Sequence, residues 1–182
     1  MRVISGKYRG KILKDFEFDT TKPTTDRVKE SIFNLIQFDV ADAVVLDLFA
    51  GTGALGIEAI SRGAKRVYLV DANSNAIKLI KDNLKGIEGD CSVNQIDFKD
   101  FLNLSNNKFD IVLLDPPYAT NFGLEAIKLL IKNDLINDGG IIIFETSESN
   151  NIEINMPGFE VTKKKYGKIM VFKMVKTNEI YD

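Results

Sequence analysis

Apolar runs and segments of helical periodicity alternate along most of the chain. Runs that predict strands lie at 44–48, 66–70, 92–96, 109–114 and 141–144, with helical segments between them at 55–61, 75–84 and 123–132. Two further strand-like runs, 159–166 and 168–174, meet at Gly167. Near-continuous apolar strands that alternate with helices are typical of a parallel sheet covered on both faces. We therefore expect an α/β fold with a doubly wound, mostly parallel sheet of seven strands that ends in an antiparallel strand.

The chain before residue 39 has a different pattern. Residues 3–14 alternate between apolar and polar and contain glycines, which suits a short hairpin or ribbon. Thr25 or Asp26 can cap a following helix, because their side-chain oxygens accept hydrogen bonds from first-turn N–H groups. Apolar residues then recur at helical spacing, at Val28, Ile32, Leu35 and Ile36, up to about Phe38. We expect residues 1–38 to form a hairpin-and-helix extension that is not independent, and residues 39–182 to form the α/β domain.

Composition narrows the possible chemistry. The 182 residues include no histidine and a single cysteine, Cys91. This excludes Ser-His-Asp and Cys-His catalysis and any His-ligated metal site, so we expect no metal cofactor. One cysteine also excludes an internal disulfide and fits a reducing, cytoplasmic setting. No apolar run reaches the ~18 residues of a membrane span, and the N-terminus lacks a signal peptide's apolar core, so we expect no membrane contact. Monomer is the default expectation.

Basic residues gather near the two ends of the chain. Residues 1–14 carry five basic and no acidic side chains, and residues 163–176 carry six basic and none acidic, although the net charge is −2. The ends are therefore the places where we expect contacts with a polyanion. The alternative is that these lysines only solubilise exposed strands and protect sheet edges.

A glycine-rich loop follows the first strand of the α/β region. Residues 51–56 match G-x-G-x-x-G, and Asp71 ends the next strand. This is the dinucleotide fingerprint, but other nucleosides share its physics, because a carboxylate accepts hydrogen bonds from any ribose. Asp47 lies just before the loop, where it would repel a pyrophosphate and attract an ammonium group. The pattern therefore favours S-adenosylmethionine over NAD.

A third acidic residue, Asp97, follows the next strand. Its carboxylate can accept a hydrogen bond from adenine N6, and Phe98 can add a backbone N–H or an apolar contact. Each acid alone would read as a solvated strand end or a helix cap; together they suit one adenosyl ligand with an amino-acid tail. We expect the cofactor site to comprise Asp47, Phe49, Gly51, Gly53, Asp71, Ala72, Asp97 and Phe98.

The sequence Asp115-Pro116-Pro117-Tyr118 ends the apolar run 109–114. Two prolines stiffen the backbone and remove two N–H donors, which leaves carboxylate and carbonyl acceptors beside an aromatic ring. Such a corner can hold a planar NH2 group, with its protons on Asp115 and the Pro116 carbonyl and the base stacked on Tyr118. Asp-Pro-Pro also occurs in ordinary turns. Behind a glycine loop it indicates methyl transfer to an exocyclic amine of a base that has left its stack.

These motifs resemble the class I S-adenosylmethionine-dependent methyltransferases, whose amino-directed members carry (Asp/Asn/Ser)-Pro-Pro-(Tyr/Phe). Residues 2–10 and 22–30, together with the two motifs above, resemble the bacterial 16S rRNA (guanine-N2) methyltransferase family over nearly the whole chain. The resemblance implies a Rossmann-like domain that methylates a guanine N2 in 16S rRNA, within an assembled or assembling small ribosomal subunit. It also implies RNA contacts by Arg9, Lys11, Lys22, Thr24, Arg27 and Lys29.

Other functions stay open at this point. N6-adenine methylation of DNA or RNA uses the same Asp-Pro-Pro-Tyr corner. An NAD-dependent oxidoreductase would share the glycine loop, although Asp47 and the lack of a second, substrate-binding domain speak against it. A noncatalytic RNA-binding module on the same fold is a further alternative, against which the intact Asp115 argues.

Overall fold

The computed structural model describes residues 1–16 and 26–177. The strands are β1 (Val44–Leu48), β2 (Arg66–Asp71), β3 (Cys91–Gln95), β4 (Phe109–Leu114), β5 (Ile136–Ser147), β6 (Phe159–Tyr166) and β7 (Ile169–Lys176). The helices are α1 (Asp26–Leu35), α2 (Ala54–Ser61), α3 (Ser74–Asn83), α4 (Phe98–Leu104) and α5 (Phe122–Lys132), with a 3-10 turn η1 (Glu148–Asn150). The predicted cap Thr25 and the predicted RNA contacts Lys22 and Thr24 lie outside the described residues.

One seven-stranded sheet organises the chain, in the order β3-β2-β1-β4-β5-β7-β6. The strands from β3 to β5 pair in parallel, whereas β7 is antiparallel to β5 and β6 is antiparallel to β7. The prediction of a mostly parallel sheet with an antiparallel end is confirmed. Only β7 runs against the direction of the other strands; it inserts between β5 and the edge strand β6, which runs in the same direction as β5.

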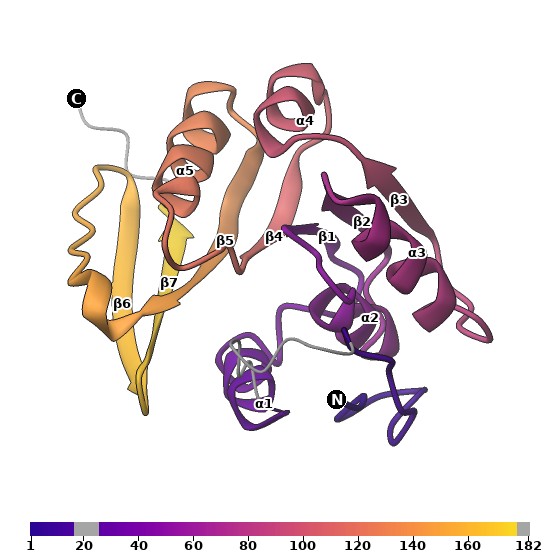
Figure 1. The fold of residues 1–182 in the computed structure, drawn as a ribbon. Helices are drawn as coiled ribbons and strands as arrows, with labels where there is room; N and C mark the ends of the chain where they lie inside the picture. Colours follow the sequence, from indigo (N-terminus) through magenta and orange to yellow (C-terminus); the bar gives the residue numbers. More distant parts are fainter. Residues whose placement is uncertain (17–25, 178–182) are drawn as a thin grey trace.

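Helices cover both faces of the sheet, with α1 and α2 on one side and α4 and α5 on the other (Figure 1). Ile32, Phe33 and Leu55 pack against one face in a cluster with strand residues such as Val45 and Leu113. A second cluster joins α4 and α5 to the opposite face and contains Leu46, Leu48, Leu114 and Phe144. Burial on both faces explains why the strands read as unbroken apolar runs rather than alternating ones.

The structure differs from the sequence prediction at two elements. Helix α4 was not predicted; it begins after Asp97, whose side chain caps it by accepting a hydrogen bond from Lys99 N at 2.8 Å. Strand β5 begins at Ile136, before the predicted run 141–144, because Gly139 and Gly140 obscure its apolar pattern. Its pairing with β4 shifts register between Phe109 and Ile111, so the glycines accompany a local irregularity.

The N-terminal segment forms the predicted ribbon and lies on helix α2. Val3 N donates to Lys11 O at 2.9 Å, and Arg2 and Ile12 form an antiparallel β-bridge. Together these contacts close an antiparallel turn. Gly6 lies so close to α2 that an added Cβ would fall 1.8 Å from Ser61 O. Its φ of +83° also requires glycine, so the residue fixes the segment against the helix.

Candidate active site

The candidate site lies where β1 and β4 end side by side. Leu48 pairs with Leu114 in the parallel register, so the next residues, Phe49 and Asp115, leave the sheet together. Two adjoining cavities open there, and both are bordered by Phe49, Gly51 and Asp115. The predicted cofactor loop and the predicted catalytic corner therefore meet at one crevice, outside the carboxyl ends of the strands.

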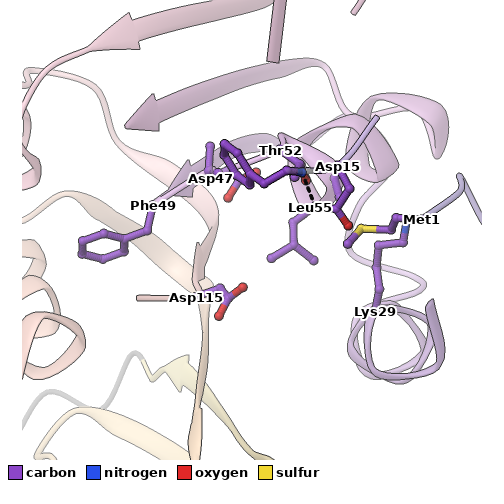
Figure 2. Close-up of a pocket in the computed structure, with 12 residues that line it drawn as sticks. Met1, Asp15, Lys29, Asp47, Phe49, Thr52, Leu55 and Asp115 are labelled. Atoms are coloured by element: carbon purple, nitrogen blue, oxygen red, sulfur yellow. Dashed lines mark hydrogen bonds between the residues drawn. The ribbon is translucent and has the colours of Figure 1, made fainter. Parts of the chain in front are cut away.

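The first cavity is bordered by the carboxylates of Asp47 and Asp115 and by Leu55 (Figure 2). Asp47 is 1% exposed, and its Oδ2 accepts a hydrogen bond from Gly56 N at 2.8 Å. A Cβ on Gly56 would lie 3.1 Å from that same oxygen and 2.7 Å from Leu69 Cδ2. Glycine at this position therefore allows α2 to approach β1 closely enough to hold the Asp47 carboxylate.

The second cavity is lined by four more of the predicted cofactor residues, Asp71, Ala72, Asp97 and Phe98. Gly53, in contrast, is in the lining of neither cavity, and a Cβ there would meet Ile80 and Leu69. The Asp71 carboxylate accepts from Gly51 N at 2.9 Å and from Asn73 N at 2.8 Å, so it shapes the glycine loop. Each carboxylate oxygen has more than one lone pair, so Asp71 can still accept hydrogen bonds from ligand hydroxyls. Phe49 adopts a φ of 70° at the same place. A non-glycine residue in this region is uncommon and is often found at functional sites.

Aromatic rings surround the far end of the second cavity. The Phe49 and Phe98 rings are 5.0 Å apart, and Phe98 and Phe122 are 5.2 Å apart, measured between centroids. Three rings beside the acids Asp71 and Asp97 form an apolar slot with polar ends, which suits a nucleoside. Sequence reasoning missed Phe122, although it opens the helix directly after the Asp-Pro-Pro-Tyr turn. It also missed Phe16, from the N-terminal segment, which borders both cavities.

The Asp-Pro-Pro-Tyr corner is a turn held by hydrogen bonds. Pro116 is buried, while Asp115 is partly exposed and borders both cavities. Thr120 N donates to Pro117 O at 3.1 Å and closes the turn. Asn150 Nδ2 donates to Tyr118 O at 2.8 Å, so the corner is also fixed from the end of β5. The corner thus offers a carboxylate at the crevice on a backbone held from two sides.

The free cysteine lies away from this crevice. Cys91 is the first residue of β3, at the amino end of the sheet. Burial and, to a smaller extent, Asp90 raise the pKa of its thiol, which keeps it protonated. Within residues 1–16 and 26–177, no group of three or more His, Cys, Asp or Glu side chains is arranged to hold a metal ion. In the same part of the chain, no helix has the length and apolar character needed to cross a membrane.

The residues predicted to contact RNA have different surroundings. Arg9 and Arg27 are exposed and border one groove together with Arg2. The Lys11 ammonium donates to the Lys85 carbonyl at the end of α3. Two arginines that are remote in sequence therefore share one surface next to α1.

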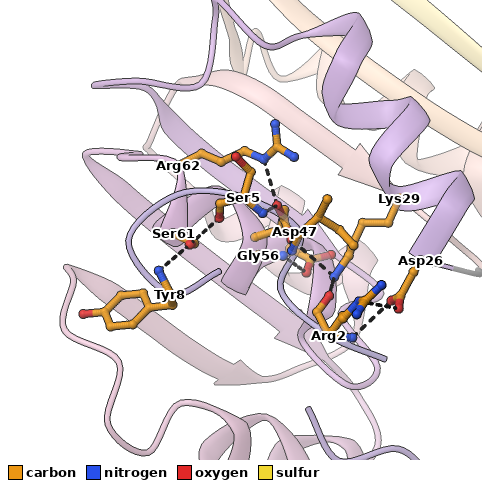
Figure 3. A network of polar contacts seen from close by, with 11 residues as sticks. Arg2, Ser5, Tyr8, Asp26, Lys29, Asp47, Gly56, Ser61 and Arg62 are labelled. Atoms are coloured by element: carbon orange, nitrogen blue, oxygen red, sulfur yellow. Dashed lines mark hydrogen bonds and ion pairs between the residues drawn. The ribbon is translucent and has the colours of Figure 1, made fainter. Parts of the chain in front are cut away.

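The structure contradicts the prediction for Lys29. Its side chain is 0% exposed and lies in a polar network inside the protein (Figure 3). Lys29 Nζ is 3.3 Å from Glu58 Oε2 and donates to the Arg2 carbonyl at 2.5 Å. Burial lowers the pKa of Lys29, and the Glu58 carboxylate opposes that shift. An ammonium group enclosed in this way cannot reach a phosphate at the surface, although Lys29 also belongs to the lining of the first cavity (Figure 2).

Glu58, in helix α2, is the centre of the network. This 0% exposed carboxylate accepts from Ile4 N at 2.8 Å and Ser5 N at 3.0 Å, and from Arg62 Nε at 2.8 Å. Together with Lys29 these donors satisfy a buried charge that would otherwise be costly. One side chain thereby joins the N-terminal segment, α1 and α2.

The strand order, with the glycine loop after β1 and the acidic corner after β4, defines a class I methyltransferase fold. The solved structure of yhhF from Escherichia coli is similar to this chain, with a TM-score of 0.88 and 29% identity over 98% of this chain and 99% of that one. HI0767 from Haemophilus influenzae gives a TM-score of 0.82 and 30% identity, again over 98% and 99% of the two chains.

The particular family follows from the sequence comparisons. The chain belongs to the family described as Conserved hypothetical protein 95, whose model matches residues 1–175. Ribosomal RNA small subunit methyltransferase D of Haemophilus influenzae is 33% identical over 181 residues, which cover 96% of this chain and 92% of that protein. The Escherichia coli protein of the same name is 34% identical over 153 residues, or 84% and 77% of the two chains. These names agree with the resemblance seen in the motifs.

The buried network generates a stability prediction. Replacing Glu58 with leucine removes the carboxylate that pairs with Lys29 and the acceptor for two backbone N–H groups. We expect the free energy of unfolding to fall by about 3–5 kcal/mol, because a buried charge loses its partner. Urea denaturation followed by circular dichroism measures this change.

The matched control is Glu88→Gln, which breaks an exposed contact from the same N-terminal segment, to Lys7 at 2.7 Å. It should leave the denaturation midpoint unchanged, because exposed ion pairs contribute little. The double variant Lys29→Met/Glu58→Leu should recover part of the loss. A Glu58→Leu protein as stable as the wild type would show that the network does not hold the segment.

Proposed function

We propose that this protein uses S-adenosylmethionine to methylate the exocyclic N2 amine of a guanine in 16S rRNA. The substrate is the RNA within an assembled or assembling small ribosomal subunit, and the enzyme acts as a cytoplasmic monomer. The observation that carries the proposal is the position of Asp115, which borders both cavities beside the glycine loop. The names of the relatives support ribosomal RNA as the substrate class.

The lining of the two cavities fits S-adenosylmethionine. In this proposal, Asp71 binds the ribose hydroxyls, Asp97 accepts from adenine N6, and the aromatic slot holds the adenine ring. Asp47 provides negative charge for the ammonium group, where a pyrophosphate would be repelled. Gly51 and Ala72 leave room for the ligand beside the backbone, and Gly53, with a φ of +79°, supports the conformation of the loop. When bound, the cofactor supplies a methyl group on a sulfonium, which needs no further activation.

The Asp-Pro-Pro-Tyr corner then acts on the substrate amine. The lone pair of this amine is delocalised into the base, so the amine is a poor nucleophile. Asp115 and the Pro116 carbonyl accept hydrogen bonds from its two N–H groups and draw the lone pair towards tetrahedral character. Tyr118 stacks on the base, a contact that is worth about 1–3 kcal/mol in comparable sites. Catalysis therefore rests on orientation and electrostatics, which a chain without histidine can provide.

The groove next to α1 contains Asp26 and Glu30 as well as three arginines, and Arg2 pairs with Asp26 at 3.7 Å. Arg9 and Arg27 therefore support the proposed phosphate-binding role of this surface. Lys22 and Thr24, which lie outside the described residues, stay proposed RNA contacts on the resemblance of the sequence motifs alone. Lys11 remains a proposed RNA contact only because it lies on the N-terminal segment, since its ammonium already donates to the Lys85 carbonyl. Lys29 is excluded by its burial.

The runner-up is N6-adenine methylation, since the same acceptors can hold adenine N6. Analysis of the methylated nucleoside distinguishes the two. We expect 16S rRNA from a strain without the enzyme, incubated with the protein and labelled S-adenosylmethionine, to yield labelled N2-methylguanosine after digestion. Label in N6-methyladenosine would reject the proposed target. A calorimetric response to NAD but not to S-adenosylhomocysteine would reject methyl transfer altogether.

Asp115→Ala separates catalysis from cofactor binding. We expect turnover to fall at least about 100-fold, because a group that stabilises the transition state is lost. The affinity for S-adenosylhomocysteine, measured by calorimetry, should change by no more than a few fold. Asp90→Asn, at the amino end of β3, is the control and should keep full turnover. A large loss of cofactor affinity in Asp115→Ala would assign the carboxylate to cofactor binding instead.

Arg9→Gln and Arg27→Gln test the RNA surface. Each should weaken RNA binding and lower the slope of log K against log salt by about one for each lost phosphate contact. Filter binding over a salt series measures both quantities. Arg66→Gln is the control, because this exposed arginine lies at the amino end of β2 and pairs with Asp90 at 3.4 Å. Equal losses in all three variants would mean that the contacts are not localised at α1.

A further inference from the structure

Glu145 is a buried carboxylate beside the candidate site. It is 1% exposed and lies in β5, one residue after the pair Leu114–Phe144 that ends the parallel register of β4 and β5. Asp115 and Glu145 each directly follow one member of this pair, so they lie next to each other on adjacent strands. Glutamate is rarely buried this completely unless it is paired, so its partner indicates its role.

The strand geometry turns Glu145 towards the same face as the catalytic corner. Leu114 and Phe144 pack into the cluster that α4 and α5 cover. Successive side chains of a strand point to opposite faces, so Asp115 and Glu145 point to the other side, where α1 and α2 lie. Asp47 also points there, because its neighbours Leu46 and Leu48 belong to the cluster under α4 and α5.

The Tyr118 hydroxyl donates a hydrogen bond to Glu145 Oε1. The backbone of the same residue is held by Asn150, whose Nδ2 donates to Tyr118 O at 2.8 Å and to Thr146 Oγ1 at 2.9 Å. Both ends of Tyr118 are thus fastened to β5 and the turn that follows it. A hydrogen bond to a carboxylate is about twice as strong as one between neutral groups, so the hydroxyl end is fixed firmly.

We propose that Glu145 is a positioning residue that fixes the Tyr118 ring against which the substrate base stacks. This inference rests on the proposed function, in which Tyr118 supports the base and Asp115 holds its amine. A change of χ1 would carry the Tyr118 hydroxyl away from Glu145, so the hydrogen bond restricts χ1 and keeps the ring in place, although rotation about χ2 leaves the hydroxyl oxygen where it is. Glu145 therefore acts through Tyr118 on the orientation of the base, and it does not touch the cofactor.

A double-mutant cycle tests this dependence. Tyr118→Phe keeps the ring and removes the donor, and Glu145→Leu replaces the carboxylate with an apolar side chain of similar size. We expect each variant to lower kcat/KM for RNA about tenfold, and the double variant to lose no more than either alone. Glu145→Gln keeps an acceptor oxygen and should restore most of the activity. Affinity for S-adenosylhomocysteine should stay unchanged in all four variants, which a general loss of structure would not allow.

Tyr68→Phe is the matched control, because Tyr68, on β2, packs against Phe101 and Phe109 and is not among the residues that line the two cavities. Additive losses in the double variant, or a Glu145→Gln protein as impaired as Glu145→Leu, would overturn the proposal. If Glu145→Leu does not fold, Tyr118→Phe decides by itself, since unchanged kcat/KM would show that the hydrogen bond is dispensable. Label is counted in any nucleoside, so adenine methylation would reject the proposed function and leave this test intact.

Discussion

The parallel register between β1 and β4 is the constraint on which the site depends. It brings the glycine loop after β1 and the acidic corner after β4 to the same edge, although they are remote in sequence. The side chains of a strand alternate, so a slip of one residue would turn Asp115 into the core under α4 and α5. Such a slip is unfavourable because it would place the carboxylates of Asp47 and Asp115 in the apolar cluster that contains Leu46, Leu48 and Leu114. Apolar packing on the face covered by α4 and α5 thus fixes which residues of β1 and β4 lie at the candidate site.

The N-terminal extension is part of the site rather than an appendage. Ser61 Oγ accepts from Tyr8 N at 2.9 Å and donates to Ser5 O at 2.6 Å, next to the point where Gly6 approaches the helix. Glu58 holds the same stretch from one turn earlier in α2. The segment continues to Phe16, which borders both cavities. Its basic residues therefore belong to a surface that is anchored to the helix behind the glycine loop.

The sequence predicted the elements that local chemistry specifies. The glycine loop, the strand-end acids and Asp-Pro-Pro-Tyr stand out because their backbone requirements are local. The structure brings Asp47, Gly51, Asp71, Asp97, Asp115 and Pro117 to the two adjoining cavities, whereas Gly53, Pro116 and Tyr118 are in the lining of neither. Helix α4 was missed because Asp97 was assigned to a ligand, although a residue of this type before an apolar stretch is also a helix cap. Lys29 was misassigned although its spacing carried a signal. It stands three and four residues before Ile32 and Phe33, on the buried stripe of α1.

Contacts between remote residues were beyond local reasoning, and Asn83 shows why they matter. This buried side chain, at the end of α3, accepts from Lys14 N at 2.8 Å and donates to Lys14 O at 3.0 Å. It also donates to Thr52 O, in the glycine loop, at 2.9 Å. A single amide therefore supports both the basic segment and the loop. Because Asn83 binds both segments, a displacement of Lys14 or of Thr52 would strain the hydrogen bond to the other. The N-terminal segment proposed to contact RNA and the glycine loop proposed to contact the cofactor therefore share one hydrogen-bonding residue, so a change in the position of one segment affects the other.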